Sequence, residues 1–171
     1  PFVIAAGIDD GKISPDTTYV DPGLVKEAGY SIKNSDGKSN GRQTMMQVLE
    51  KSLNTGVIFV EKMLGNRKFS EYVKRFGFGE KTGIDLPGEV NGNVKNLDNL
   101  KSNIQFFTSA FGQGISVTAL QLVNAYAALA NDGILMKPQI VDKLIYPDGT
   151  VEEIEPQELR RVIKEDTAKQ L

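Results

Sequence analysis

Hydrophobic positions recur at helical spacing in two neighbouring stretches of the chain. Residues 56–64 place apolar side chains one turn apart and are followed by Gly65, a residue type common just beyond a helix. Residues 68–76 carry four large side chains at i, i+3, i+4 and i+7, the spacing of one helix face: Phe69, Tyr72, Val73 and Phe76. The pattern predicts one helix in each stretch.

The clearest helical pattern covers residues 117–131. Thr118 is followed three residues later by Gln121, a capping box in which each side chain bonds the other residue's backbone N–H. Gly133 follows, where a glycine favours the end of a helix. We expect the buried face of this helix to consist of four apolar side chains: Leu120, Val123, Ala127 and Ala130.

Extended and irregular segments surround these helices. Residues 17–41 have the pattern of short strands broken by glycines, and residues 42–51 have that of a further helix. Residues 139–146 and 150–155 alternate about a Pro-Asp-Gly turn, which predicts a β-hairpin near the C-terminus. Residues 77–115 show almost no periodicity, so we expect an irregular, wrapping loop there.

Each end of the sequence has the pattern of an incomplete helix. Phe2 to Ile8 reads as the tail of a helix, and the chain begins inside this hydrophobic segment without Met. Asp166 to Leu171 reads as the first turns of another helix. We therefore expect residues 1–171 to be part of one domain that is truncated at both ends.

Composition removes several classes of function. With 20 Lys and Arg against 22 Asp and Glu, the net charge is -2, so the chain has no basic excess for binding nucleic acid. It contains no His and no Cys, which excludes His-based catalytic triads, disulfides and Cys/His zinc sites. No stretch approaches the roughly 18 consecutive apolar residues of a membrane span.

The chain matches no phosphate-binding or calcium-binding motif, because residue types or spacings differ at the candidate positions. Residues 77–83 read GFGEKTG, but Glu80 stands where a Walker A loop needs Gly, and the glycines miss G-x-G-x-x-G by one position. The Asp-Gly pairs at residues 10–11 and 36–37 lack the alternating carboxylates of an EF-hand loop. We expect turns at the two Asp-Gly pairs.

Ser52-Leu53-Asn54 lies at the junction of two predicted helices and has two interpretations. In the first, Ser52 satisfies the end of one helix while Asn54 or Thr55 caps the next, as such residues often do. In the second, the two polar side chains at spacing i, i+2 point toward a common site. Local chemistry alone favours capping.

Three long stretches resemble a known family, and this resemblance favours the second interpretation of Ser52 and Asn54. They are GRQTMMQVLEKSLNTG at 41–56, FGFGEKTGIDLPGE at 76–89 and FGQGISVTALQLVNAYAALANDGILMKP at 111–138. Read in order, the chain resembles the transpeptidase domain of a class B penicillin-binding protein. The opening PFVIAAGIDDGKISPDTTY looks like the segment that directly follows this family's Ser-x-x-Lys motif. The resemblance covers essentially the whole chain.

The resemblance implies roles for two residues. The family has three active-site motifs, Ser-x-x-Lys, Ser-x-Asn and Lys-Thr/Ser-Gly. Ser52 and Asn54 match Ser-x-Asn, which implies that Ser52 joins the proton relay between the catalytic Lys and the departing D-alanine. Asn54 would donate its amide to the substrate's peptide carbonyl and help to orient that Lys.

The other two motifs are expected outside the chain. Ser35 and Lys38 fit Ser-x-x-Lys by letter but lie in a polar, Gly-rich stretch, which suits a solvated loop rather than a buried nucleophile. Lys81-Thr82-Gly83 fits Lys-Thr-Gly by letter, but a loop-forming sequence follows it, so we interpret Lys81 as non-catalytic. The nucleophile would lie just before Pro1 and the true Lys-Thr/Ser-Gly beyond Leu171.

The resemblance implies an α+β fold, namely the mainly helical portion of the penicillin-binding-protein and serine β-lactamase type, with most strands of the central sheet absent. It implies a peptidoglycan D,D-transpeptidase that works on stem peptides through an acyl-serine at the extracytoplasmic face of the bacterial membrane. β-Lactams would be inhibitors, cell-wall synthesis proteins would bind through the missing N-terminal region, and no metal or organic cofactor is expected. The chain alone is expected neither to react with penicillin nor to fold cooperatively.

Two other functions remain open at this stage. One is a non-catalytic relative that binds cell-wall peptide or partner proteins, and the presence of both Ser52 and Asn54 argues against it. The other is a sensor that β-lactams acylate but that does not act on peptidoglycan. The class B sequence GIDLPGE at residues 83–89 favours the transpeptidase over the sensor.

Overall fold

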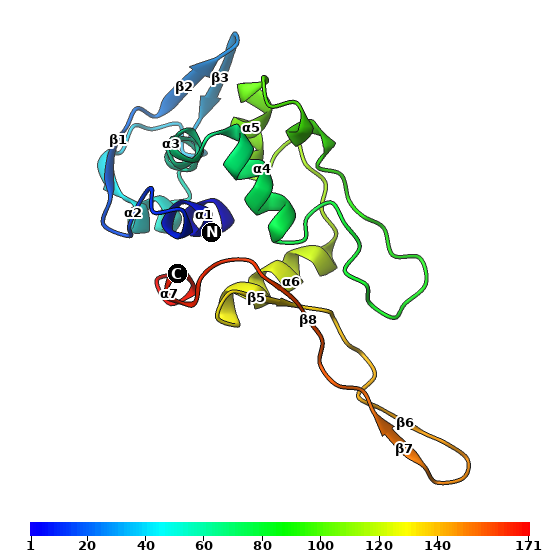
Figure 1. Cartoon of the computed structure of the whole chain (residues 1–171). Helices are drawn as coiled ribbons and strands as arrows, with labels where there is room; N and C mark the ends of the chain where they lie inside the picture. Colours follow the sequence, from blue (N-terminus) through cyan, green and yellow to red (C-terminus); the bar gives the residue numbers. More distant parts are fainter.

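A helical body and a long two-stranded ribbon make up the structure, a computed structural model that describes residues 1–171 (Figure 1). The helices are α1 (Phe2–Asp9), α2 (Met45–Glu50), α3 (Asn54–Leu64), α4 (Asn66–Arg75), the 3-10 helix η1 (Lys95–Asp98), α5 (Asn103–Ala110), α6 (Ala119–Ala130) and α7 (Glu165–Ala168). The strands are β1 (Thr18–Asp21), β2 (Leu24–Glu27), β3 (Tyr30–Lys33), β4 (Gly41–Thr44), β5 (Ile134–Met136), β6 (Lys143–Ile145), β7 (Val151–Glu153) and β8 (Glu158–Arg161). No helix combines the length and apolar character needed to cross a membrane.

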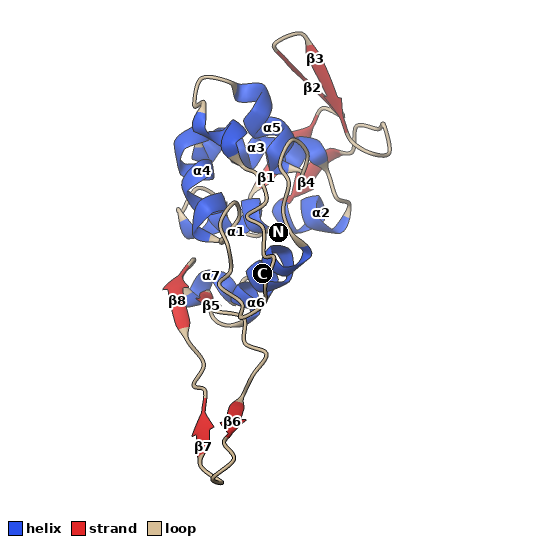
Figure 2. Cartoon of the chain, turned by 90° about the vertical axis from the view of Figure 1, so that its right-hand side faces the viewer, coloured by secondary structure: helices blue, strands red, loops and turns tan.

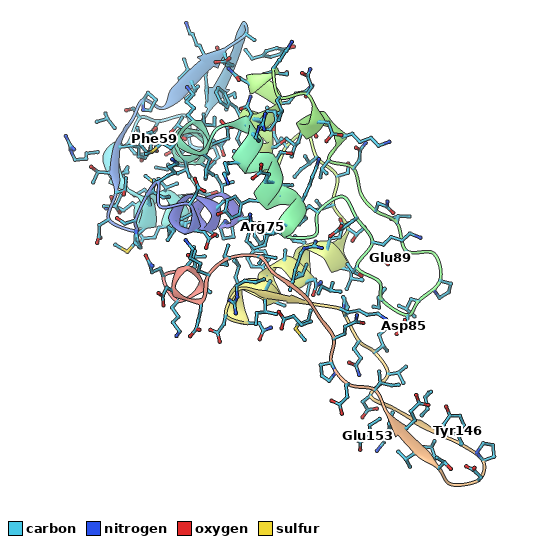
Figure 3. The ribbon with its side chains drawn as sticks, viewed as in Figure 1. Phe59, Arg75, Asp85, Glu89, Tyr146 and Glu153 are labelled. Atoms are coloured by element: carbon cyan, nitrogen blue, oxygen red, sulfur yellow. The ribbon has the colours of Figure 1, made fainter.

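The strands form four separate antiparallel pairs instead of one sheet: β1 with β4, β2 with β3, β5 with β8, and β6 with β7. The last two pairs follow one another along the ribbon, which projects away from the helices (Figure 2). Tyr146 and Glu153 lie on its outer part (Figure 3). The hairpin predicted near the C-terminus is confirmed, with strands shorter than the alternating pattern suggested. The mixture of helices and small antiparallel pairs confirms the α+β class.

Helix α3 lies at the centre of the body and packs against α1, α4 and α5. The two helices predicted on either side of Gly65 are confirmed as α3 and α4, each starting two residues earlier than the apolar spacing indicated. Of the four side chains at helical spacing, Phe69, Tyr72 and Phe76 are buried and Val73 is partly buried. Each large apolar side chain removed from water contributes about 1.5–3 kcal/mol, so this face holds α4 on the core.

The helix predicted over residues 42–51 begins only at Met45. Residues Gly41–Thr44 instead form β4, which pairs with β1, a strand 20 to 26 residues earlier in the sequence. Thr44 then caps α2, because its hydroxyl accepts from the Gln47 N–H at 3.2 Å while the Gln47 side chain accepts from the Thr44 N–H at 2.9 Å. A strand thus leads directly into the short helix that precedes Ser52.

Helix α6 begins with the predicted capping box of Thr118 and Gln121, but the predicted buried face is wrong. The buried residues are Gln121, Ala125 and Ala128, whereas Val123 is 65% exposed. The Gln121 amide donates to the Glu80 and Asn91 carbonyls at 2.5 and 2.7 Å, which turns this face inward. Apolar residues occur on both sides of α6, so their spacing could not select the buried one.

The irregular loop expected over residues 77–115 contains two helices, η1 and α5. Helix α5 buries Phe106 and Phe107. Ile104, Phe107 and Phe111 stand at helical spacing, a signal that the sequence analysis missed, while Ser102 before the helix makes no side-chain cap. The segment up to Val94 is irregular as expected, and Figure 3 shows Asp85 and Glu89 on its outer loop.

Glu61 is a buried carboxyl group on the central helix. Glu61 is only 1% exposed, and its Oε1 has no hydrogen-bond partner in the protein. Burial raises the pKa of Glu61 from 4.5 to about 7, with the nearby charges of Lys62 and Glu27 as smaller effects. The folded protein therefore holds a proton on Glu61 at pH values where the unfolded chain has lost it.

We expect Glu61→Gln to stabilise the protein in a pH-dependent way. The folded pKa lies above the unfolded one, so native stability falls as pH rises from about 4.5 to about 7 and then levels. The variant should match the wild type near pH 4.5 and exceed its free energy of unfolding by about 3 kcal/mol at pH 8. Denaturant unfolding of the chain together with the flanking sequence that its gene encodes, at both pH values, measures this. Exposed Glu71 provides the control: Glu71→Gln should change stability by less than about 0.5 kcal/mol at either pH, and an equal gain in both variants would contradict the prediction.

Candidate active site

Ser52 occupies a strained backbone position at the end of α2. The Leu53 N–H donates to the Val48 carbonyl at 3.0 Å and the Ser52 N–H to the Leu49 carbonyl at 3.2 Å, the two bonds of a Schellman motif. This motif places Ser52 at φ +52°, a left-handed conformation usually taken by glycine. For a residue with a Cβ that conformation costs about 1–2 kcal/mol, so a side chain is kept here against a local preference.

The Ser52 side chain itself caps no helix. Its backbone N–H closes α2, while its exposed hydroxyl makes no hydrogen bond within the protein. The interpretation of Ser52 as a side-chain cap is therefore wrong. Strained backbone at a residue with a free polar group is typical of functional sites.

Asn54 and Thr55 do not cap α3 either. The N-cap position belongs to Leu53, which makes no side-chain cap; among the first backbone N–H groups of the helix, that of Thr55 donates to the Asn34 side chain at 3.1 Å. The Asn54 Nδ2 instead donates to the Lys33 carbonyl at 2.8 Å. An amide group has two N–H donors and one acceptor oxygen, so one N–H and Oδ1 of Asn54 are left for another partner.

Ser52 and Asn54 both line one cleft of about 410 Å³. Its polar side chains are those of Ser52, Asn54 and Ser109, and the last is satisfied because its hydroxyl donates to the Gln105 carbonyl at 2.7 Å. The remaining lining is mostly apolar: Pro1, Phe2, Val3, Val48, Leu49, Leu53, Val57, Phe69, Val73, Phe78, Ala110, Phe111, Gly112, Ile115, Val117 and Leu122. An apolar cleft with a few convergent polar groups is the usual form of a small-molecule site.

The first residues of the chain form part of this cleft. Pro1 to Val3, at the start of α1, line it together with the α2–α3 junction, and Figure 1 shows the N-terminus beside these helices. The opening segment and the Ser-x-Asn match, about 50 residues apart in sequence, therefore meet in space.

The two letter matches to the other motifs lie outside the cleft. Lys81-Thr82-Gly83 belongs to no strand. The Glu89 carboxylate accepts from the Thr82 N–H and hydroxyl at 2.6 and 2.5 Å and from the Gly83 N–H at 3.2 Å, so these groups serve to fold the loop. Ser35 and Lys38 are exposed in the loop between β3 and β4. No Lys lines the cleft, and no cluster of acidic side chains is arranged to hold a metal ion.

A buried carboxylate beneath the α2–α3 junction escaped the sequence analysis. Asp21, the last residue of β1, is 0% exposed and accepts hydrogen bonds from Thr55, Asn34, Asn40 and Gly23. Burial by itself would raise the pKa of Asp21, but these hydrogen bonds outweigh it and lower the pKa to about 2. The signal that could have found it is the strand period, since Asp21 shares the buried face of β1 with Tyr19.

Comparison with known proteins identifies relatives of the chain. The family model for the penicillin binding protein transpeptidase domain matches residues 1–171. Penicillin-binding protein PbpB from Mycolicibacterium smegmatis is 35% identical over 167 residues, which cover 98% of this chain and 26% of that protein. Stage V sporulation protein D from Bacillus subtilis is 36% identical over 173 residues, covering 99% and 27%. The chain thus spans about a quarter of the length of these relatives.

Solved structures give the same result for the fold. Penicillin binding protein 3 from Mycobacterium tuberculosis, in complex with aztreonam, superposes with a TM-score of 0.90 and 32% identity over 99% of this chain and 38% of the other. The peptidoglycan D,D-transpeptidase MrdA of Escherichia coli is a further relative, 29% identical over 168 residues that cover 92% of this chain and 26% of that protein. The resemblance found in the sequence is confirmed. The chain therefore belongs to the penicillin-binding protein transpeptidase domain family, among its class B members.

Proposed function

We propose that the protein containing this chain is a peptidoglycan D,D-transpeptidase. A serine hydroxyl attacks the carbonyl carbon between the two D-alanines of a stem peptide, and the C–N bond breaks. The departing D-alanine takes up a proton at its amine. The amine of a neighbouring stem peptide then attacks the acyl-serine, which forms the cross-link and returns the serine. A β-lactam ring, opened by the same serine, leaves the enzyme acylated.

One observation carries the proposal. The Ser52 hydroxyl, which has no hydrogen bond, and the Asn54 amide, which uses one N–H for the Lys33 carbonyl, line a common cleft beside Pro1. Ser52 relays the proton to the departing D-alanine, a role that needs a hydroxyl with no other partner. Asn54 donates its second N–H to the peptide carbonyl of the substrate, while its Oδ1 faces the catalytic Lys. Acid-base assistance of this kind contributes about 10²- to 10⁴-fold.

The nucleophilic Ser-x-x-Lys and the Lys-Thr/Ser-Gly strand come from sequence that flanks these 171 residues. The cleft has no Lys side chain of its own, and the chain covers only about a quarter of its curated relatives. Residues 1–171 then form the interior of a transpeptidase domain whose protein acts at the extracytoplasmic face of the membrane. Below, "full-length protein" means this chain with the flanking sequence that its gene encodes.

A labelling experiment with a fluorescent penicillin tests the proposal. The full-length protein should acquire a fluorescent band that survives denaturing electrophoresis and that unlabelled ampicillin prevents. The 171-residue chain, expressed alone, should stay unlabelled and unfold without a cooperative transition. Labelling of the isolated chain would contradict the assignment of the nucleophile to flanking sequence. A full-length protein that never labels would instead be a non-catalytic relative.

A second measurement separates a transpeptidase from a β-lactam sensor. Mass spectrometry of the full-length protein with a D-Ala-D-Ala stem peptide and an acceptor amine should detect released D-alanine and the cross-linked product. Acylation by penicillin without either product would favour the sensor, and the proposed reaction would be wrong.

A further inference from the structure

We propose that Asp21 is a positioning residue for Asn54: it fixes the position of the Asn54 amide, which faces the cleft, without touching that amide itself. The inference rests on the proposed function, because it assigns Asp21 to the same site. Asp21 does not line the cleft and touches no substrate. It acts through the two residues that flank the Asn54 hydrogen bond, Thr55 on the helix side and Asn34 on the strand side.

The first connection runs directly to α3. The Thr55 hydroxyl donates to Asp21 Oδ1 at 2.5 Å and lies 3.2 Å from the Tyr19 hydroxyl. Thr55 follows Asn54 in the first turn of the helix and is itself buried. The N-cap residue Leu53 makes no side-chain bond, so the bond from Thr55 to Asp21 helps to anchor the backbone that carries Asn54.

The second connection runs through the end of β3. The Asn34 Nδ2 donates to both Asp21 oxygens, at 3.0 and 2.9 Å, which aims the Asn34 Oδ1 at the Thr55 N–H, 3.1 Å away. The residue before Asn34 is Lys33, whose carbonyl accepts from the Asn54 Nδ2 at 2.8 Å. Donor and acceptor of that bond are therefore each one residue from a partner of Asp21.

Only an ionised carboxylate satisfies this cluster. The Asp21 oxygens also accept from the Gly23 N–H at 2.8 Å and from the backbone and side-chain N–H groups of Asn40 at 2.8 and 2.9 Å. Every group that faces Asp21 in these bonds is a donor, so an amide at position 21 would turn an NH₂ group against other donors. Buried donors left without an acceptor are costly, and the loop from Gly23 to Asn40 would move to avoid this.

Fixing the Asn54 amide has a direct chemical consequence. The bond from one N–H to the Lys33 carbonyl restrains rotation of the amide, and this restraint orients its other N–H and its Oδ1 in the cleft. A displacement of about 1 Å at a reacting group can cost about 100-fold in rate. Loss of Asp21 should therefore slow acylation even in protein that remains folded.

The test measures the second-order rate constant of acylation of the full-length protein by a fluorescent penicillin. We expect Asp21→Asn to lower it by about 10- to 100-fold at a temperature well below the melting point of the variant. The matched control is Asp9→Asn. Asp9 is also buried and accepts from three donors, but it joins α1 to α4 and α7 away from the α2–α3 junction. It should keep the wild-type rate within about twofold.

A double-mutant cycle separates positioning from general destabilisation. If Asp21 acts through Asn54, then Asp21→Asn should cause no further loss in an Asn54→Ala background. Additive losses, or a wild-type rate in Asp21→Asn, would overturn the inference. Thr55→Val, which keeps the shape but removes the bond to Asp21, should lower the rate in the same non-additive way and serves if Asp21→Asn does not fold. A wild-type protein that is never acylated would refute the proposed function instead, and this inference with it.

Discussion

Replacing Ser52 with alanine is expected to slow acylation of the full-length protein by penicillin by about 10²- to 10⁴-fold. The Ser52 hydroxyl makes no hydrogen bond within the protein and lines the same cleft as Asn54, so its removal breaks no structural bond. The proposed loss arises because the proton relay to the leaving nitrogen is interrupted. Stopped-flow or gel-based measurement of the acylation rate constant, with the melting temperature recorded in parallel, checks the prediction.

The matched variant Ser52→Gly separates catalysis from backbone strain. Glycine adopts φ near +52° without the Cβ clash, so this variant should be more stable than Ser52→Ala by about 1 kcal/mol. Both lack the hydroxyl and should lose acylation equally. Wild-type acylation in both variants would mean that Ser52 only ends a helix. A slow Ser52→Ala beside a normal Ser52→Gly would point to backbone geometry, not to the hydroxyl.

Replacing Asp9 with alanine is expected to destabilise the folded protein by about 4 kcal/mol. Asp9 accepts from the Tyr72 hydroxyl at 2.7 Å, the Lys164 N–H at 2.7 Å and the Thr167 hydroxyl at 3.0 Å. Residues more than 150 positions apart are joined by this single buried carboxylate. Its removal leaves three donors without an acceptor, and each buried donor without a partner costs about 1–3 kcal/mol of stability. A fall of about 10 °C in the melting temperature is the corresponding measurement.

The neighbouring Asp10 supplies the control for this stability effect. It forms only loose surface pairs with Lys12 at 3.9 Å and Lys68 at 3.8 Å, so Asp10→Ala should change stability by less than about 1 kcal/mol. Equal losses in the two variants would show that the Asp9 bonds add little.

The Asp9 contribution should also depend on pH. Burial alone would raise the pKa of Asp9, but its hydrogen bonds from Lys164, Tyr72 and Thr167 outweigh this and hold it below 3.8. A carboxyl with a lowered folded pKa stabilises the protein above its unfolded pKa and loses that effect as pH falls through the folded value. The stability difference between wild type and Asp9→Ala should therefore be constant from neutral pH to about pH 4 and shrink below it.

Elements with a strong local signal could be predicted from the sequence. The face of α4 repeats Phe69, Tyr72 and Phe76 at helical spacing, and the box of Thr118 and Gln121 starts α6. In both cases the interactions that form the element lie within about four residues of one another. The Ser52 and Asn54 assignment came from a motif together with ordered resemblance, since their local chemistry alone favoured capping.

Elements that depend on distant partners could not be predicted. Helix α5 is stabilised by the burial of Phe106 and Phe107, and β4 by pairing with β1, so both depend on contacts with distant parts of the chain. The buried face of α6 was predicted wrongly because Gln121 bonds the carbonyls of Glu80 and Asn91, 41 and 30 residues away. Tertiary hydrogen bonds outweighed apolar spacing there.

By itself, the sequence determined the class of protein, the principal helices, the C-terminal hairpin and the pair Ser52 and Asn54 as the place to look for chemistry. Only the tertiary structure decided that their side chains cap nothing, that they share a cleft with Pro1, and that Asp21 lies behind them. The division has a physical reason. Periodicity and caps are set by neighbours along the chain, whereas a free hydroxyl, a cleft and a buried carboxylate exist only where segments tens of residues apart meet.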